Sequence, residues 1–206
     1  MSYSLVGKTV LITGSTDGLG HKLALALAGM QSNVIVHGRD QGKINQVVAE
    51  LQQINPSGAF SGILSDLNLP ETIPAAFSGI NHLDILINNA GVWQEGDTTD
   101  ATSEQIIELL HVNLGAPLLI TRTLLPILKK SDYSQILNVV SVAGVEIPSG
   151  YFHTIYSATK FGLQAYSEAL EKEYDNTKLR VMGYYPGGME TELFNKAGIR
   201  YKQHEP

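Results

Sequence analysis

The sequence of 206 residues contains no cysteine, which excludes disulfide bridges, thiolate metal sites and cysteine nucleophiles. It also has little positive charge: 14 Lys and Arg residues against 20 Asp and Glu residues give a formal net charge of -6. This balance argues against nucleic acid or an anionic membrane surface as the main partner and favours a small molecule. No apolar run approaches the roughly 20 residues of a membrane span.

Two further signals are missing. The chain runs from Met1 directly into a strand-like stretch, without the basic start, long apolar segment and small-residue cleavage site of a signal peptide. We therefore expect a cytoplasmic protein. The six histidines are scattered without the spacing of metal ligands, so no metal site is predicted.

What the chain does contain is a regular alternation of short β-rich runs and longer segments of helical period. With 43% hydrophobic residues, it has enough apolar material for one domain. The expected strands cover residues 9–13, 33–37, 60–64, 83–87, 135–140 and 180–185, and the expected helices include residues 19–28, 41–54, 104–129 and 156–176. This order predicts an α/β fold with a three-layer, doubly wound parallel sheet of the Rossmann type.

One expected helix carries clear local signals. Thr102 with Gln105 has the spacing of a capping box and predicts where the long fourth helix begins. Pro117 and Pro126 lie inside the same helical pattern and are expected to kink or segment it, because proline lacks the amide hydrogen that a helix interior needs.

A glycine-rich turn follows the first expected strand. Glycines there let the backbone turn tightly and let a pyrophosphate approach the start of the next helix, where amide groups and the helix dipole favour an anion. The spacing is Gly-x-x-x-Gly-x-Gly, which differs from the Gly-x-Gly-x-x-Gly fingerprint, and a plain strand-to-helix turn is the alternative. The candidate cofactor residues of this turn are Gly14, Ser15, Thr16, Asp17, Gly18, Leu19 and Gly20.

Tyr156 and Lys160 stand four residues apart in an expected helix, so that a phenol and an ammonium share one face. An unperturbed tyrosine, with a pKa of about 10, holds its proton too firmly to be an efficient acid near neutrality. A nearby cation lowers that pKa, so the pair is a candidate proton donor. Taken singly, each of these residues is read more simply as a packing or surface residue.

These features form one ordered series over residues 13–191. Its members are the Thr13-Gly-x-x-x-Gly-x-Gly turn, Asn88-Asn89-Ala90-Gly91, Asn113, Ser141, Tyr156-x-x-x-Lys160 and Pro186-Gly187-x-x-x-Thr191. The series resembles the short-chain dehydrogenase/reductase (SDR) family. The resemblance implies an oxidoreductase that transfers hydride between NADP(H) or NAD(H) and a carbonyl or alcohol substrate. Two alternatives are a dinucleotide-binding regulatory or scaffold protein with little turnover, and a lyase or epimerase.

The resemblance also implies residue roles. Tyr156 would be the general acid/base and Ser141 would hydrogen-bond the substrate oxygen. Lys160 would hold the nicotinamide ribose and lower the Tyr156 pKa, and Asn113 would bind a water of a proton relay. The 15 positions from Ser141 to Tyr156 suggest a small insertion in residues 142–155. Tyr156 and Lys160 are also cofactor contacts in this scheme, together with Asp66, Leu67, Asn89, Ala90, Gly91, Pro186, Gly187 and Thr191.

The end of the second expected strand bears on the choice of dinucleotide. Arg39 can make charge-assisted bonds to the 2′-phosphate of NADP, whereas an acid at the strand end would accept the ribose hydroxyls of NAD. We therefore expect NADP(H), with NAD(H) possible because Asp17 and Asp40 add negative charge nearby. The alternative for Arg39 is a solvated loop charge. Asp66 resembles the adenine-contacting Asp of the family, and its alternative is a turn residue or helix cap.

The expected substrate-facing residues are mostly apolar, which favours an apolar or aromatic carbonyl compound. The resemblance further implies a homodimer or homotetramer. Relatives usually continue through a substrate loop, a helix and a seventh strand, so we expect residues 1–206 to form a single domain of an incomplete chain; alternatively the sheet ends at the sixth strand. The substrate candidates are Trp93, Gln94, Val145, Glu146, Tyr151, Phe152, His153, Met189 and Phe194.

Overall fold

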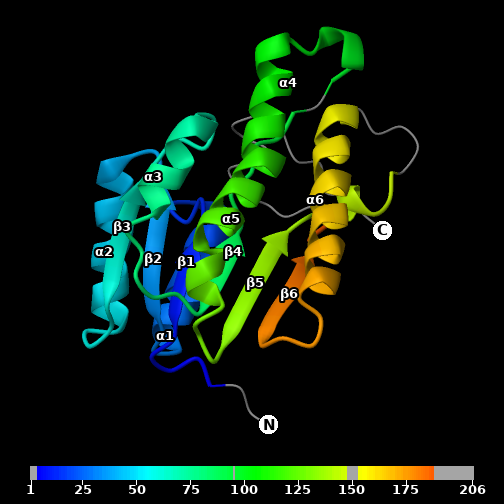
Figure 1. Cartoon of the computed structure of the whole chain (residues 1–206). Helices are drawn as coiled ribbons and strands as arrows, with labels where there is room; N and C mark the ends of the chain where they lie inside the picture. The colour runs from blue at the N-terminus through cyan, green and yellow to red at the C-terminus, as the bar shows by residue number, and fades with distance from the viewer. Residues whose placement is uncertain (1–3, 95, 148–152, 188–206) are drawn as a thin grey trace, which may run out of the picture.

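The computed structural model describes residues 4–94, 96–147 and 153–187 of the chain. Its six strands are all parallel and lie in the order β3-β2-β1-β4-β5-β6, as the ribbon shows (Figure 1). This confirms the predicted doubly wound α/β fold. The strand bounds are β1 Thr9–Ile12, β2 Asn33–Gly38, β3 Phe60–Leu64, β4 Ile85–Asn88, β5 Ser134–Val139 and β6 Leu179–Tyr184.

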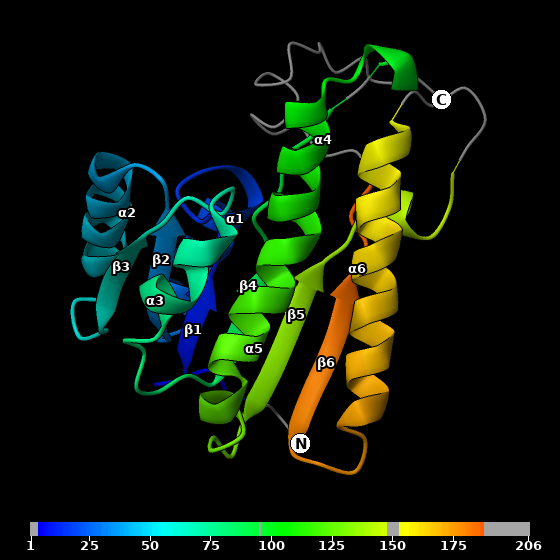
Figure 2. The same ribbon diagram turned by 45° about the horizontal axis from the view of Figure 1, so that its top comes forward.

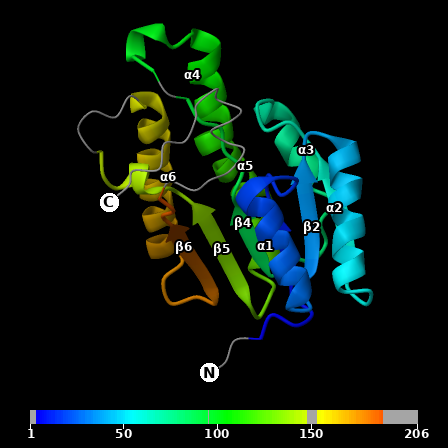
Figure 3. The same cartoon turned by 180° about the vertical axis from the view of Figure 1, so that it is seen from behind.

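Helices cover both faces of this sheet. Helices α1 (Gly18–Gly29) and α2 (Gln41–Ile54) lie on the face that Figure 3 turns toward the viewer. Helices α3 (Ile73–Phe77), α5 (Ala116–Leu128) and α6 (Thr154–Glu173) lie on the opposite face, seen in Figure 1. The described chain also has three 3-10 helices, which span Pro70–Thr72, Thr98–Asp100 and Val142–Gly144.

The two apolar layers follow from the alternation of side chains along a strand. In β1, Leu11 packs into the cluster beneath α3, α5 and α6, whereas its neighbours Val10 and Ile12 pack into the cluster beneath α1 and α2. In β4, Leu86 joins the first cluster and Ile85 the second. Both faces of the central strands are therefore buried, which explains why these strands are almost entirely apolar.

The fourth expected helix is interrupted, but in a different way from the prediction. Helix α4 (Ser103–Leu110) continues through a π-helical stretch, His111–Gly115, into α5, and the three form one rod in Figure 2. The interruption is a widened turn in which the Ala116 amide bonds the His111 carbonyl. Pro117 falls in the first turn of α5, directly after this widened turn. Pro126 lies inside α5 without ending it.

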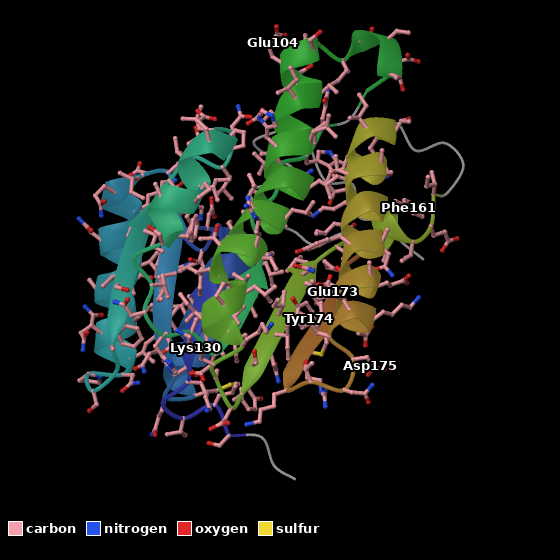
Figure 4. All side chains as sticks on the ribbon, in the orientation of Figure 1. Glu104, Lys130, Phe161, Glu173, Tyr174 and Asp175 are labelled. Atoms are coloured by element: carbon pink, nitrogen blue, oxygen red, sulfur yellow. The ribbon has the colours of Figure 1, made fainter. Side chains whose placement is uncertain are left out.

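The run Ser103–Leu128 is long and apolar enough, by length and composition only, to cross a membrane. Part of its apolar surface belongs to the protein core, because Ile120, Leu124 and Leu128 are fully buried against the sheet, whereas Ile107 and Leu110 are exposed. Glu104 and Lys130 mark the two ends of this rod in Figure 4.

Element boundaries differ from the prediction at the ends. The capping box is present, since the Thr102 side chain accepts from the Gln105 amide and the Gln105 side chain from the Thr102 amide. Thr13 leaves β1 because it already belongs to the glycine turn. Helix α6 ends at Glu173, three residues before Asn176, whose φ of 63° is left-handed. Helix α3 was not predicted; it is only five residues long and begins with Pro74 in its first turn.

At the amino-terminal edge of the sheet, the buried Asp84 joins three segments. Its carboxylate accepts hydrogen bonds from the Thr9 amide at 2.8 Å and the Ser131 hydroxyl at 2.5 Å. His82 Nε2 lies 3.1 Å and Lys8 Nζ 3.8 Å away. Burial acts to raise the pKa of Asp84, but the bonds from Ser131 and Thr9 outweigh it and hold the pKa below its usual value.

We expect Asp84→Asn to lower the free energy of unfolding by about 2 kcal/mol or more at pH 7, because a buried, multiply bonded carboxylate loses its charge. A depressed native pKa gives stability that is present above the unfolded pKa and lost as pH falls through the native pKa. The difference in free energy of unfolding between the unmodified protein and Asp84→Asn should therefore become smaller below about pH 4. Denaturant unfolding at pH 7 and pH 3 measures it, and Asp132→Asn, at the exposed partner of Lys178, is the control with little effect. An equal loss at both pH values would contradict the electrostatic account.

Candidate active site

The carboxyl ends of the parallel strands meet at one edge of the sheet. Strands β1 and β4 are neighbours there, while the chain leaves β1 toward β2 and leaves β4 toward β5. Such a switch point is where doubly wound sheets bind their ligands, because the two connections diverge and leave a crevice. The glycine turn, Asn89 and Ser141 all follow strands at this edge.

The glycine turn is packed too tightly for larger residues. A Cβ atom on Gly14, whose φ is 62°, would lie 2.9 Å from the Ala90 Cα. One on Gly20 would lie 2.5 Å from both the Asn89 Nδ2 and the Gly14 oxygen. The helix that follows is capped by Asp17, whose carboxylate accepts from the Gly18 amide at 2.7 Å. The turn is thus a close backbone cradle at the start of α1, as an incoming pyrophosphate requires.

Residues that follow β4 hold this cradle on one side. Asn89 Nδ2 donates to the Thr13 oxygen at 2.9 Å and to the Gly14 oxygen at 3.2 Å. In return, the Thr13 hydroxyl accepts from the amides of Asn89 and Ala90, each at 3.0 Å. Asn89 and Ala90 therefore lie against the turn, as their place in the predicted cofactor set requires.

His37 at the end of β2 holds the other side. Its Nδ1 accepts from the Gly14 amide at 3.0 Å, and its main chain bonds the Ser15 amide and hydroxyl at 3.0 Å each. This side-chain contact was not predicted. The signal available in the sequence is a histidine at the end of an otherwise apolar strand, where it must be either buried or at the sheet edge.

Tyr156, Ser141 and Trp93 come together beyond β5. Tyr156 is 6% exposed, and the Ser141 side chain lies near its hydroxyl, close enough for hydrogen bonding to act on the Tyr156 pKa. Trp93 packs edge-on against the Tyr156 ring at 4.4 Å between centroids, and the buried His153 lies 4.9 Å from Trp93. Ser141 has a φ of 128°, which is strained for a residue other than glycine, and its hydroxyl also accepts from the Ala143 amide at 3.2 Å.

The pKa of Tyr156 is shifted in the direction opposite to the expected one. Burial raises it to about 12, and the hydrogen bond with Ser141 only partly opposes this. Burial also lowers the pKa of Lys160 to about 8. The Lys160 ammonium lies 5.7 Å from the Tyr156 ring centroid but donates to the Val139 oxygen at 2.9 Å. In the protein alone, desolvation therefore outweighs the attraction between the two groups.

Asn113 occupies the π-helical stretch and is fully buried. Its amide pairs with the Val92 main chain, accepting from the nitrogen at 2.8 Å and donating to the oxygen at 2.9 Å. It also donates to the Thr159 hydroxyl at 3.3 Å. The side chain thus binds the loop after β4 to the helix that carries Lys160, and neither Val92 nor Thr159 was predicted.

The predicted cofactor residues at the far end of the sheet lie mostly at the surface. Arg39 and Asp66 are exposed after β2 and β3. The carboxylate of Asp40 caps α2 by accepting from the Lys43 amide at 3.0 Å, and Asp66 accepts from the Asn68 amide at 2.9 Å. The Leu67 side chain is 5% exposed and packs into the core, so a contact of this residue with the cofactor would have to come from its main chain.

The substrate candidates divide into three groups. Trp93 lies against Tyr156, and Gln94 and His153 line a pocket beside it that also includes Asp97 and Thr154. Val145 and Glu146 are exposed just after the Val142–Gly144 turn. Among the predicted cofactor contacts, Pro186 contributes its oxygen to the Val142 amide at 3.1 Å, and the neighbouring Gly187 is exposed. The remaining predictions lie outside the described residues, namely Tyr151, Phe152, Met189, Thr191 and Phe194.

Within residues 4–94, 96–147 and 153–187, no group of three or more His, Asp or Glu side chains could hold a metal ion. The arrangement instead offers a close glycine cradle, a buried phenol near a serine hydroxyl, and a buried lysine. The profile of short chain dehydrogenases matches residues 8–202, nearly the whole chain.

The chain belongs to the short-chain dehydrogenase family. An NADP-dependent 3-hydroxy acid dehydrogenase of Schizosaccharomyces pombe is 31% identical and aligns over 98% of this chain and 82% of its own. An uncharacterised oxidoreductase of Staphylococcus epidermidis is 29% identical over 90% of this chain and 80% of its own.

Solved structures of short-chain dehydrogenases agree with this membership. One from Sphingobium yanoikuyae, in complex with NADPH, superposes with a TM-score of 0.86 at 28% identity, over 94% of this chain and 75% of that one. A putative short chain dehydrogenase from Escherichia coli, also complexed with NADPH, superposes with a TM-score of 0.85 at 26% identity, over 94% of this chain and 82% of that one. As a short-chain dehydrogenase, the present chain is an oxidoreductase.

Proposed function

We propose that this short-chain dehydrogenase transfers hydride between NADP(H) and a carbonyl or alcohol substrate, with Tyr156 as the general acid/base. The observation that carries the proposal is the placement of the buried Tyr156 phenol beside Ser141 and Lys160 at the switch point of the sheet. Relatives named as NADP-dependent or solved with NADPH support the choice of cofactor.

The residues around the cradle fit a dinucleotide. The amides at the start of α1, from Gly18 to Gly20, would hold the pyrophosphate, since the close packing at Gly14 and Gly20 leaves backbone groups facing the ligand. Exposed Arg39 would bind the 2′-phosphate, and Asp66 would meet the adenine edge. Asn89, Ala90 and Gly91 would line the central part, with Lys160 at the ribose beside the nicotinamide, which supplies or accepts the hydride when bound.

Tyr156 would move the proton. In the reducing direction its phenol donates to the carbonyl oxygen, and in the oxidising direction the phenolate accepts from the alcohol. Ser141, which lies near that phenol, would donate a second hydrogen bond to the same oxygen and stabilise the charge that develops there. The Lys160 ammonium would stabilise the phenolate against the burial that now raises its pKa.

Asn113 would keep these groups in place. Its bonds to Val92 and Thr159 connect the Trp93 loop to the helix that bears Tyr156 and Lys160. Trp93 and His153 form an aromatic wall next to the Tyr156 ring, and the adjoining pocket has both apolar and polar members. We therefore propose a substrate with an apolar or aromatic part next to its carbonyl group.

A panel of ketones, aldehydes, hydroxy acids and alcohols tests the function. For each substrate, the absorbance of NADPH reports whether NADPH is oxidised or NADP is reduced. The proposal predicts turnover with at least one carbonyl or alcohol class. Tight NADPH binding without turnover on any member would instead favour a dinucleotide-binding protein.

Cofactor preference depends on Arg39 in this scheme. We expect the protein to bind NADPH more tightly than NADH, and Arg39→Ala to reduce that preference by about tenfold or more, because one charge-assisted contact to phosphate is lost. The affinity of Arg39→Ala for NADH should stay within about twofold of that of the unmodified protein, since NADH has no 2′-phosphate. Titration of cofactor fluorescence measures both, with Arg180→Ala at the far edge of the sheet as the matched control. Equal affinities of the unmodified protein for NADPH and NADH would refute the assignment.

A further inference from the structure

We propose that His37 is a positioning residue for the cofactor turn: its imidazole Nδ1 fixes the Gly14 amide and thereby the conformation in which residues 14–20 receive a pyrophosphate. The inference rests on the proposed function, because it takes the glycine turn as the cofactor cradle. It adds a residue from the neighbouring strand that need not contact the cofactor.

The contacts join β2 to the turn at three points. The Gly14 amide donates to His37 Nδ1, the Ser15 amide donates to the His37 oxygen, and the His37 amide donates to the Ser15 hydroxyl, all at 3.0 Å. The Ser15 hydroxyl in turn donates to the Ile12 oxygen at 2.8 Å. Two of these links use main-chain atoms of His37 and would survive a change of its side chain. The link to Gly14 depends on the imidazole alone.

The surroundings of the His37 imidazole keep the ring neutral, so that its Nδ1 can accept a hydrogen bond. It is 3% exposed, and the Phe77 ring of α3 packs against it at 5.5 Å between centroids. Since Nδ1 accepts from an amide, the proton of the neutral ring lies on Nε2. Burial lowers the pKa of His37 to about 4, while the main chain of Ser65 and the carboxylate of Asp66, both following β3, oppose this shift. The acceptor is therefore maintained throughout the neutral pH range.

Gly14 is the point where such an acceptor matters. Its left-handed backbone and its approach to Ala90 leave little room for adjustment. Asn89 holds the carbonyl side of the Gly14 peptide, and His37 holds the amide side. Without Nδ1 the amide would be a poorly solvated donor without its present acceptor, and the turn would have to rotate to satisfy it. Rotation would displace the amides at the start of α1.

Three substitutions separate this role from packing. In asparagine, Oδ1 is attached to Cγ as Nδ1 is in histidine, so His37→Asn keeps an acceptor at that place. In His37→Gln the acceptor lies one bond further out, and in His37→Leu there is none. We expect NADPH to bind about tenfold more weakly to the Leu and Gln variants and within about threefold of the unmodified protein in the Asn variant. The kcat at saturating NADPH should change by less than about threefold in all three.

The measurement is titration of NADPH fluorescence on the whole protein, with adenosine 2′-monophosphate as a second ligand that lacks the pyrophosphate. Its affinity should be similar in all variants. Phe77→Leu is the matched control, since it loosens the packing on the imidazole, lowers the melting temperature and leaves the Gly14 bond in place. It should bind NADPH normally.

The outcomes are distinct. If the unmodified protein binds neither NADPH nor NADH, the proposed function fails. If it binds NADPH and His37→Leu binds equally well, the role of His37 alone is overturned. The same holds if His37→Asn loses as much affinity as His37→Leu, or if all variants weaken the two ligands in parallel with their melting temperatures, because packing would then explain the effect.

Discussion

Replacing Tyr156 with phenylalanine is expected to lower kcat by about a thousandfold or more, while NADPH binds within about threefold of normal. General acid/base catalysis by a positioned side chain typically contributes 10²- to 10⁴-fold, and here the proton has no other proposed donor. Phenylalanine keeps the edge-on contact with Trp93 and the burial of the ring. It removes only the hydroxyl, near which the Ser141 side chain lies. The fold should therefore be preserved.

The same helix provides the matched control. Tyr166 lies ten residues further along α6, is partly buried, and hydrogen-bonds Thr121 through its hydroxyl. Tyr166→Phe makes the same chemical change at a distance from the strand ends and should leave kcat within about twofold. Steady-state NADPH oxidation gives kcat, and fluorescence titration gives cofactor affinity. Turnover of Tyr156→Phe within tenfold of the unmodified protein would remove Tyr156 from the proposed mechanism.

Lys160→Met is expected to lower kcat by about a hundredfold or more and at the same time to stabilise the folded protein. The loss of activity follows from the missing ammonium, which would stabilise the Tyr156 phenolate and hold the cofactor ribose. The gain in stability follows from burial: lowering the Lys160 pKa from 10.5 to about 8 costs about 3 kcal/mol at neutral pH. Methionine leaves the Val139 oxygen without its donor, which returns about 1 kcal/mol of that gain.

The stability gained by Lys160→Met should depend on pH, because it comes from the lowered pKa of Lys160. The penalty on the buried ammonium is fully present below about pH 8, the folded pKa, and disappears as pH rises to 10.5, the unfolded value. The free energy of unfolding of Lys160→Met should therefore exceed that of the unmodified protein by about 1 to 2 kcal/mol at pH 7. This difference should decrease between pH 8 and 10. Denaturant unfolding measures both. Lys172→Met, exposed in the last turn of α6, is the control. A destabilised, inactive Lys160→Met would mean that Lys160 mainly supports the fold.

Such opposite effects on activity and stability are typical of functional sites, where residues are retained despite an energetic cost. Ser141 is a second residue of the site whose conformation carries an energetic cost. Ser141 adopts a φ of 128°, in a region that favours glycine, although its hydroxyl is needed in the proposed mechanism. By contrast, the Asp84 network at the opposite edge of the sheet combines a depressed pKa with several hydrogen bonds, as a stabilising site should.

The fold was largely predictable because its signals are local. Strand alternation and helical periodicity depend on side chains a few positions apart, and the Thr102 capping box is a contact within four residues. The errors occurred where distant contacts decide. The π-helical turn at Asn113 forms where that side chain can pair with Val92, 21 residues away. The Nδ1 contact of His37 with the Gly14 amide, which joins residues 23 positions apart, was likewise not predicted.

The sequence by itself determined the order of the motifs, the parallel α/β arrangement and membership of a family whose profile covers residues 8–202. The tertiary structure alone decided the electrostatic state of the site. Burial raises the Tyr156 pKa and lowers that of Lys160, the Lys160 ammonium bonds Val139, and His37 holds the Gly14 amide. The physical reason is that desolvation and hydrogen-bond geometry depend on atoms brought together from separate strands, whereas periodicity and motif spacing record only neighbours along the chain.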